Sequence, residues 1–195
     1  MEAVVDAAGL ERFPIFAISQ GGSVAIEYAA RHPELVSRLI LLNAFARGWR
    51  WSSSAAFIAS VEAMKILMAR GWGGESPVFR QMFAALLLTG GTLPQWEWFD
   101  AMQRATTSPE NAVRLIESFG QMDVRQRLAE VRAPTLVLHS RSDRFIPARL
   151  GQEIAAGIAG ARFVGLATNN HILLADEPAF ERLASEIEAF LAEDV

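Results

Sequence analysis

The segment that most constrains the fold is residues 13–31, where an apolar run changes abruptly into a helical pattern. Residues 13–18 predict a short strand, and the small and aliphatic residues after the turn recur at helical spacing. Ser19 stands at the turn between Ala17 and Gly21, whose small size we expect where the strand and helix backbones nearly touch. This arrangement lifts a hydroxyl group clear of a sheet, which suits a nucleophile. Ser19 alone is equally compatible with a purely structural turn.

Strands and helices alternate at both ends of the chain. The pattern predicts strands at 13–18, 36–43, 134–140 and 161–166, and helices at 1–10, 20–31, 148–158 and 177–193. Apolar strands that alternate with helices indicate a parallel sheet covered on both faces. The predicted fold class is therefore α/β, a mostly parallel sheet flanked by helices, with its functional loops at the carboxyl ends of the strands.

The middle of the chain, residues 45–131, shows no strand pattern and contains all five tryptophans. Helices are expected there at 55–70, 76–88, 95–105, after the Ser108-Pro109 start signal, and at 123–131. We therefore predict one domain over 1–195, in which a helical lid, residues 46–131, is inserted between core segments 1–45 and 132–195. Most of the aromatic residues are expected to pack in the lid core, and one or two to face a ligand cavity.

The composition excludes several classes of protein. A net charge of −4 with scattered charges argues against a nucleic acid or an anionic membrane as the partner. The chain has no cysteine, and its sequence shows neither a histidine pair at ligand spacing nor a glycine-rich phosphate loop, so we expect no metal and no cofactor. The first residues lack the features of a signal peptide, and no uncharged apolar run is long enough to span a membrane. A cytoplasmic location is the resulting expectation.

Two further residues would complete a nucleophilic site with Ser19. Asp143 and His171 lie 28 positions apart, in the loops that follow two successive predicted strands. Ser19 also follows a predicted strand, so all three residues are expected on the same rim of the sheet. The order Ser, Asp, His along the chain is that of a known catalytic constellation. Individually, Asp143 also suits a solvated turn and His171 a structural loop. Of the other histidines, His32 is expected to cap a helix and His139 to be structural.

These residues lie in motifs that resemble the α/β-hydrolase superfamily. The motifs are the turn at 17–21, in which Ala17 replaces the first glycine of Gly-x-Ser-x-Gly, and the segments 138–147 and 170–178. Within the superfamily, residues 18–22, 43–49 and 156–163 resemble hydrolase domains joined to LuxR-type regulators or adenylate cyclases, and the similarity covers nearly the whole chain.

The resemblance implies roles for four residues. Ser19 would be the nucleophile, His171 the general base and Asp143 the acid that orients it, while the backbone N–H of Gln20 would donate to the oxyanion. A serine at the turn argues against dehalogenase or epoxide-hydrolase chemistry. Asn43 leaves the alternative acid position, at the end of the second strand, unoccupied.

The chain departs from the superfamily pattern at its start. In that fold several strands precede the nucleophile, and a loop after an early strand supplies the second oxyanion N–H, but only a short helix precedes residue 13 here. We therefore expect a truncated domain or misplaced start with impaired turnover, and an apolar sheet edge at 13–18 that a second copy of the chain covers in a homo-oligomer. A fragment that acts without catalysis is the other explanation.

Two functions remain open at this point. The first is a serine hydrolase that cleaves an ester, thioester or amide of a small apolar acyl substrate held under the lid. The second is a ligand-binding or regulatory module that keeps the fold and the pocket without useful turnover.

Overall fold

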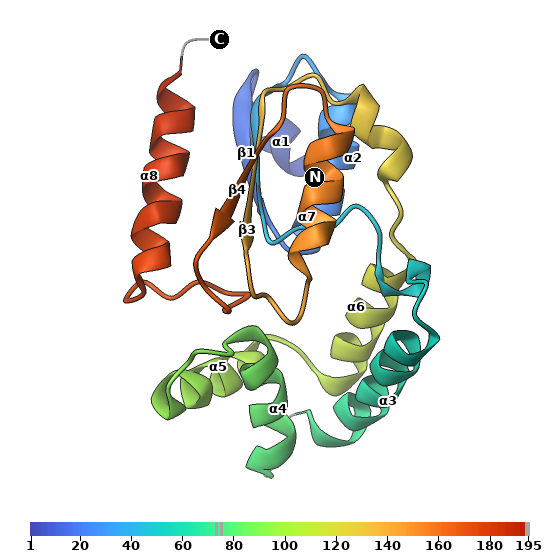
Figure 1. Ribbon diagram of the computed structural model, residues 1–195. Helices are drawn as coiled ribbons and strands as arrows, with labels where there is room; N and C mark the ends of the chain where they lie inside the picture. The colour runs from blue at the N-terminus through green and yellow to red at the C-terminus, as the bar shows by residue number, and fades with distance from the viewer. Residues whose placement is uncertain (73, 75, 194–195) are drawn as a thin grey trace.

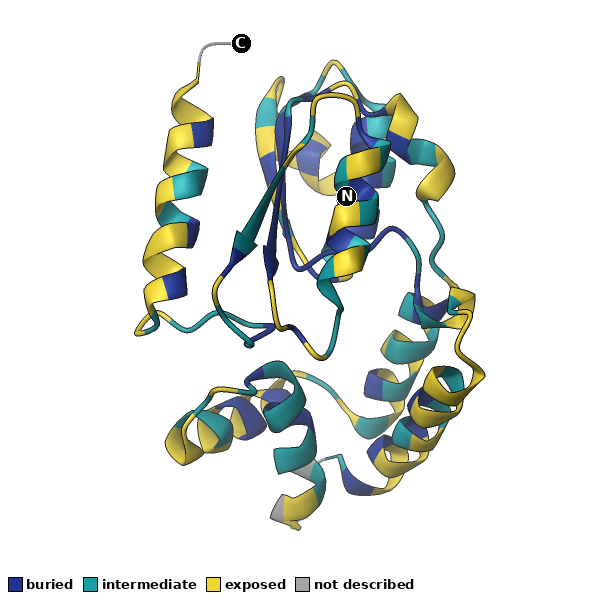
Figure 2. Ribbon diagram, viewed as in Figure 1, coloured by how far each residue is buried: buried dark blue, intermediate teal, exposed yellow. Residues whose placement is uncertain are grey.

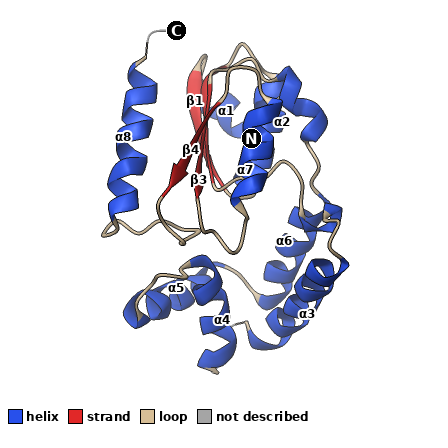
Figure 3. Ribbon diagram, in the orientation of Figure 1, coloured by secondary structure: helices blue, strands red, loops and turns tan. Residues whose placement is uncertain are grey.

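The computed structural model describes residues 1–72, 74 and 76–193. Strands β1 (Phe13–Ile18), β2 (Val36–Leu42), β3 (Thr135–Ser140) and β4 (Arg162–Leu166) form one sheet in the order β1-β2-β3-β4. Every pair of neighbouring strands is parallel. Figure 3 shows the strands gathered in one half of the molecule, with helices on both sides of the sheet. The predicted α/β class is confirmed.

The sheet is covered on both faces because its strands are apolar on both faces. Leu39 and Leu41 of β2 pack in one core cluster, whereas Ile40 and Leu42 pack in another, as the alternation of side chains along a strand requires. The first cluster receives α1 (Glu2–Ala8), α2 (Gly21–Arg31) and α7 (Ala148–Gly157), and the second receives α8 (Pro178–Ala192). Figure 1 shows α8 on one side of the sheet, and α2 and α7 on the other.

The helical segment lies at the carboxyl ends of the strands, toward which the strand arrows point (Figure 1). It contains η1 (Trp49–Trp51), α3 (Ala55–Gly71), α4 (Pro77–Leu87), α5 (Leu93–Thr106) and α6 (Pro109–Gln121). The next element, η2 (Arg125–Glu130), lies outside it and packs against α2 and α7 beside the sheet. Ser108 caps α6 by accepting a hydrogen bond from the Asn111 N–H, as its sequence predicted. None of the helices in the described part of the chain combines the length and hydropathy that a bilayer crossing requires.

The chain enters and leaves this segment side by side, in a stalk formed by residues 46–48 and 122–124. The Gly48 N–H donates to the Met122 carbonyl, and the Val124 N–H to the Ala46 carbonyl, both at 2.8 Å. The prediction of a helix over 123–131 is wrong in its first part, because the Val124 N–H is bonded to the other arm of the stalk. Only residues 125–130 turn, as a 3-10 helix.

Strand β1 forms one edge of the described sheet, since it pairs only with β2. The sequence predicted a buried strand here, but Ile15 is its only buried residue. Phe16 and Ile18 are 48% and 44% exposed, because they face the side where α8 covers β3 and β4 but not β1 (Figure 2). The edge is apolar, as expected, and its covering by a second copy of the chain stays a prediction.

Candidate active site

Ser19 occupies a sharp turn between β1 and α2. Its backbone has φ +54°, a left-handed conformation that costs a residue other than glycine free energy and is held here by the flanking elements. The Ser19 N–H donates to the Leu42 carbonyl at 2.9 Å, and its own carbonyl accepts from the Gly22 N–H at 3.0 Å. The turn therefore continues the pairing of β1 with β2 and starts α2 within a few residues.

The small residue that this turn requires is Gly22 rather than the predicted Gly21. A Cβ atom on Gly21 would lie 3.9 Å from the Ala17 Cβ, which is ordinary van der Waals contact. On Gly22 it would lie 2.4 Å from the Ala44 Cβ, which no packing allows. The close approach is thus between α2 and the segment after β2.

Asp143 and His171 meet in the loops that follow β3 and β4. The imidazole Nδ1–H of His171 donates to Asp143 Oδ2 at 2.7 Å, and both residues are buried. The other carboxylate oxygen, Oδ1, accepts from the backbone N–H groups of Phe145 and Ile146 at 2.8 and 2.9 Å. The Phe145 ring meets the imidazole edge to face, with centroids 5.0 Å apart. These contacts fix one orientation of the Asp143 carboxylate. The carboxylate is hydrogen-bonded to Nδ1 of His171 and not to Nε2.

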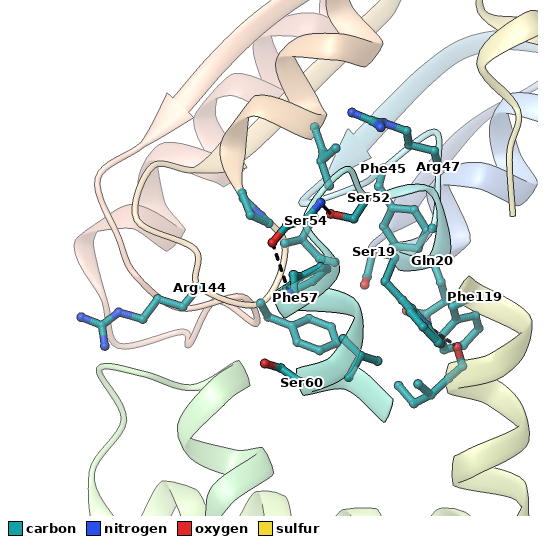
Figure 4. Close-up of a pocket in the computed structure, with 18 of the residues that line it drawn as sticks. Ser19, Gln20, Phe45, Arg47, Ser52, Ser54, Phe57, Ser60, Phe119 and Arg144 are labelled. Atoms are coloured by element: carbon teal, nitrogen blue, oxygen red, sulfur yellow. Dashed lines mark hydrogen bonds between the residues drawn. The ribbon is translucent and has the colours of Figure 1, made fainter. Parts of the chain in front are cut away.

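Ser19 lines a cavity of about 500 Å³ that also reaches the loop of Asp143. Figure 4 shows the Ser19 hydroxyl directed into this cavity, among aromatic side chains that include Phe57 and Phe119. Other apolar lining residues are Phe45, Trp49, Val61, Met64, Leu86, Ile116, Phe145, Ile146 and Leu150. Within the described residues, no hydrogen bond joins Ser19 to His171, so the contact between hydroxyl and imidazole is not formed in this state.

Gln20 is the N-cap residue of α2, and it lines the same cavity. Among the described residues none accepts a hydrogen bond from its backbone N–H. An unsatisfied N–H at a helix N-terminus carries a partial positive charge and suits a developing oxyanion. The oxyanion role that the resemblance implied for Gln20 stays a prediction.

His139 and His32 make contacts that suit the structural roles expected for them. His139 is fully buried in β3, where its Nε2–H donates to the Ile146 carbonyl at 2.9 Å. Burial lowers the pKa of His139, which favours the neutral imidazole, although Nε2 lies 4.0 Å from Asp143 Oδ2. His32 ends α2 and is hydrogen-bonded to Glu2 at 3.0 Å. His139 therefore braces the loop that carries Asp143.

Asn43 supports the site in a way that the sequence did not predict. It follows β2 with φ +50° and is fully buried. Its side-chain Oδ1 accepts from the Ser140 N–H at 2.7 Å, and its Nδ2 donates to the His171 carbonyl at 2.6 Å. In the sequence, Asn43 stands out only as a polar residue directly after an apolar strand. Its role becomes clear from the groups that it contacts, the Ser140 N–H and the His171 carbonyl.

We expect Asn43→Ala to lower the free energy of unfolding by about 3 kcal/mol, because it leaves the Ser140 N–H and the His171 carbonyl buried without partners. Urea unfolding measures the loss. Asn43→Gly is the matched control, since it removes the same hydrogen bonds but tolerates positive φ. A loss in Asn43→Gly of less than half that of Asn43→Ala would show that backbone conformation, rather than hydrogen bonding, dominates.

The described residues contain no group of three or more histidine, aspartate or glutamate side chains arranged to hold a metal ion. The groups that the structure brings to this rim are the Ser19 hydroxyl, the His171 imidazole paired with Asp143, and the N-terminus of α2.

The fold agrees with the comparisons to known proteins. The chain belongs to the alpha/beta hydrolase family, whose family model matches residues 2–185. It is 29% identical over 171 residues to the 2-hydroxy-6-oxo-6-phenylhexa-2,4-dienoate hydrolase of Comamonas testosteroni, which covers 83% of this chain and 57% of that protein. It is also 29% identical over 188 residues to the AB hydrolase superfamily protein YisY of Bacillus subtilis, covering 88% of this chain and 64% of that protein.

Solved structures support the same fold. The esterase EaEST from Exiguobacterium antarcticum superposes with a TM-score of 0.82 at 20% identity, over 98% of this chain and 71% of that chain. The chain spans less than two thirds of the length of the two relatives named above. The likeness to domains linked to LuxR-type regulators stays a prediction, as does the expectation of missing strands.

Proposed function

We propose that the chain acts as a serine hydrolase on carboxylic esters, or on related thioesters or amides, through an acyl-enzyme formed on Ser19. The observation that carries the proposal is the 2.7 Å hydrogen bond between Asp143 and His171, two buried side chains from successive rim loops. A buried carboxylate that accepts from one imidazole nitrogen leaves the other nitrogen as the proton acceptor. Neither residue of this pair lines the cavity itself, but both follow strands of the same parallel sheet whose first strand leads into the strained Ser19.

The residues would act in a fixed order. Ser19 Oγ attacks the substrate carbonyl while His171 Nε2 takes its proton, and Asp143 stabilises the imidazolium that forms. The Gln20 N–H donates to the oxyanion, and His171 then returns the proton to the leaving alcohol. Water, deprotonated by the same imidazole, releases the acid. The Ser19–His171 hydrogen bond would form in the substrate complex, since such contacts are commonly loose without substrate.

The cavity favours a substrate with an apolar acyl or aryl group. Its lining is dominated by aromatic and aliphatic side chains. Besides Ser19, its hydroxyl-bearing residues come from the stretch that leads into α3 and from α3 itself: Ser52, Ser53, Ser54 and Ser60. A volume of about 500 Å³ accommodates a group of phenyl or medium acyl size. The dienoate in the name of the Comamonas relative contains such a phenyl group, so this compound belongs in the substrate panel beside p-nitrophenyl esters.

The test is covalent trapping. A fluorophosphonate probe incubated with the chain is expected to add one phosphonyl group, and peptide mass spectrometry is expected to find it on Ser19. Prior boiling of the protein should abolish the labelling. A ligand-binding or regulatory module predicts instead that a hydrophobic ligand binds the cavity while Ser19 stays unlabelled, and that result would reject the hydrolase proposal.

A further inference from the structure

The loop that carries His171 is held by the helical segment. The backbone N–H groups of His171 and Ile172 both donate to the carbonyl of Leu87, at 2.9 and 3.1 Å. Leu87 is the last residue of α4, where carbonyl groups have no partner within the helix. The backbone of the proposed base is therefore fixed by a helix end that lies far from it in the sequence.

The side chain of Asn170 makes a second contact between the His171 loop and the helical segment. Its Oδ1 accepts from the backbone N–H of Gly90, in the turn between α4 and α5, at 2.7 Å. Its Nδ2 lies 3.3 and 3.4 Å from the two carboxylate oxygens of Glu177, at the start of α8. Its backbone carbonyl accepts from Ser140 Oγ, at the end of β3, at 2.7 Å. The buried side-chain amide thus joins the helical segment to the start of α8, and the backbone of the same residue is held by β3.

Among the hydrogen bonds of the described residues, those that join α4 and α5 to the sheet-bearing part of the chain all involve this loop. Each such bond between residues 77–106 and the sheet-bearing part of the chain ends on residues 170–176, including one from Gln95 to Asp176 at 3.0 Å. The apolar contacts agree. Ile172 and Leu174 pack against a cluster of Ala84, Leu87, Leu88, Trp96 and Phe99. Figure 1 shows the chain between β4 and α8 passing next to the α4–α5 turn.

We propose that Asn170 is a positioning residue that docks the α4–α5 turn onto the His171 loop, so that His171 is aligned with Ser19 only while this turn is docked. The inference rests on the proposed function. The Asn170 side chain is engaged by Gly90 and Glu177 and directly precedes His171, so Asn170 acts through His171 and not on the substrate. The other attachment of the helical segment is the stalk, so a displacement of α4 and α5 would break the Asn170 contacts and release the base.

The docking is tested by hydrogen–deuterium exchange on three proteins: the native chain, Asn170→Ala and Asn111→Ala. Asn111 is the matched control, because it is an exposed asparagine in α6, away from the α4–α5 turn. Peptides that cover residues 84–92 and 169–176 are expected to exchange about 10-fold faster in Asn170→Ala and at the native rate in Asn111→Ala. Unchanged exchange in Asn170→Ala would overturn the docking role, whether or not the chain is an enzyme.

The alignment of the base is tested by the split between kcat and KM on a p-nitrophenyl ester. Asn170→Ala is expected to lower kcat by about 100-fold, the effect of a misplaced catalytic group, and to leave KM within about 2-fold. The low-field Nδ1–H proton resonance of His171 should broaden in the same variant, and this signal reports alignment even if the native chain has no turnover. Faster exchange with a native kcat and a sharp His171 resonance would contradict the positioning role.

A rescue separates positioning from general loss of stability. Asn170→Asp keeps the acceptor for Gly90 but sets a carboxylate against Glu177, so kcat is expected to fall. Adding Glu177→Gln restores an amide opposite the carboxylate, and kcat is expected to return to within about 5-fold of native. A double variant that stays as slow as Asn170→Asp would contradict the proposed contact.

Discussion

The Ser19→Ala variant is expected to lose ester turnover by about 10⁵-fold, down to the rate of the uncatalysed background. The proposed reaction has no other nucleophile, and the expected acyl-enzyme cannot form without the hydroxyl group. The fold should survive, because the contacts of Ser19 that hold the turn are made by its backbone N–H and carbonyl groups. Initial rates on p-nitrophenyl butyrate measure the loss, and circular dichroism checks the fold.

Ser53→Ala is the matched control for this variant. Ser53 lines the same cavity, so its substitution changes a nearby hydroxyl group without touching the proposed nucleophile. It is expected to keep kcat within about 3-fold of native, since no transition-state contact is lost. Equal rates in Ser19→Ala and the native chain would mean that any turnover observed is background, and the hydrolase proposal would then fail for this chain.

Asp143→Asn is expected to lower kcat by about 10⁴-fold with little change in stability. The Asn Oδ1 can still accept from the Phe145 and Ile146 N–H groups, so the loop keeps its hydrogen bonds. The amide group, however, donates toward His171 Nδ1, which favours the imidazole tautomer with the proton on Nε2. That tautomer cannot take the proton of Ser19. Steady-state kinetics with urea unfolding on the same samples measures both quantities.

Asp6→Asn controls for the change of charge, because Asp6 lies in α1 and makes no contact with the site. It is expected to match the native chain in kcat. If Asp143→Asn loses several kcal/mol of stability together with activity, the carboxylate is a structural brace and its role in orienting His171 is not supported.

The candidate site could be predicted from the sequence because its members follow apolar strands directly. Parallel strands bring their carboxyl ends to one rim, so the position of Asp143 and His171 after two strands was enough to predict that they meet, and they do. Asn43 and Asn170 also follow strands, but an asparagine has no reactivity of its own to draw attention. Their roles depend on which backbone groups lie opposite them.

The structure also decided features that depend on neighbours. The sequence of β1 predicts a buried strand, yet Phe16 and Ile18 are exposed because no described element packs over that face. Similarly, the helix predicted from Asp123 starts only at Arg125 and is a 3-10 helix, since pairing with residues 46–48 occupies the backbone of residues 122–124.

The sequence by itself determined the α/β class, the helical segment between the core segments, and the three rim residues, because periodicity and the order of strands are local properties. Tertiary structure alone decided that Gly22 is the glycine at the close approach, that Ser19 and His171 stand without a hydrogen bond, and that the His171 loop is held by α4 and the α4–α5 turn. These are contacts between segments far apart in the chain. Their geometry depends on how the packed layers fit together, which no single stretch of sequence specifies.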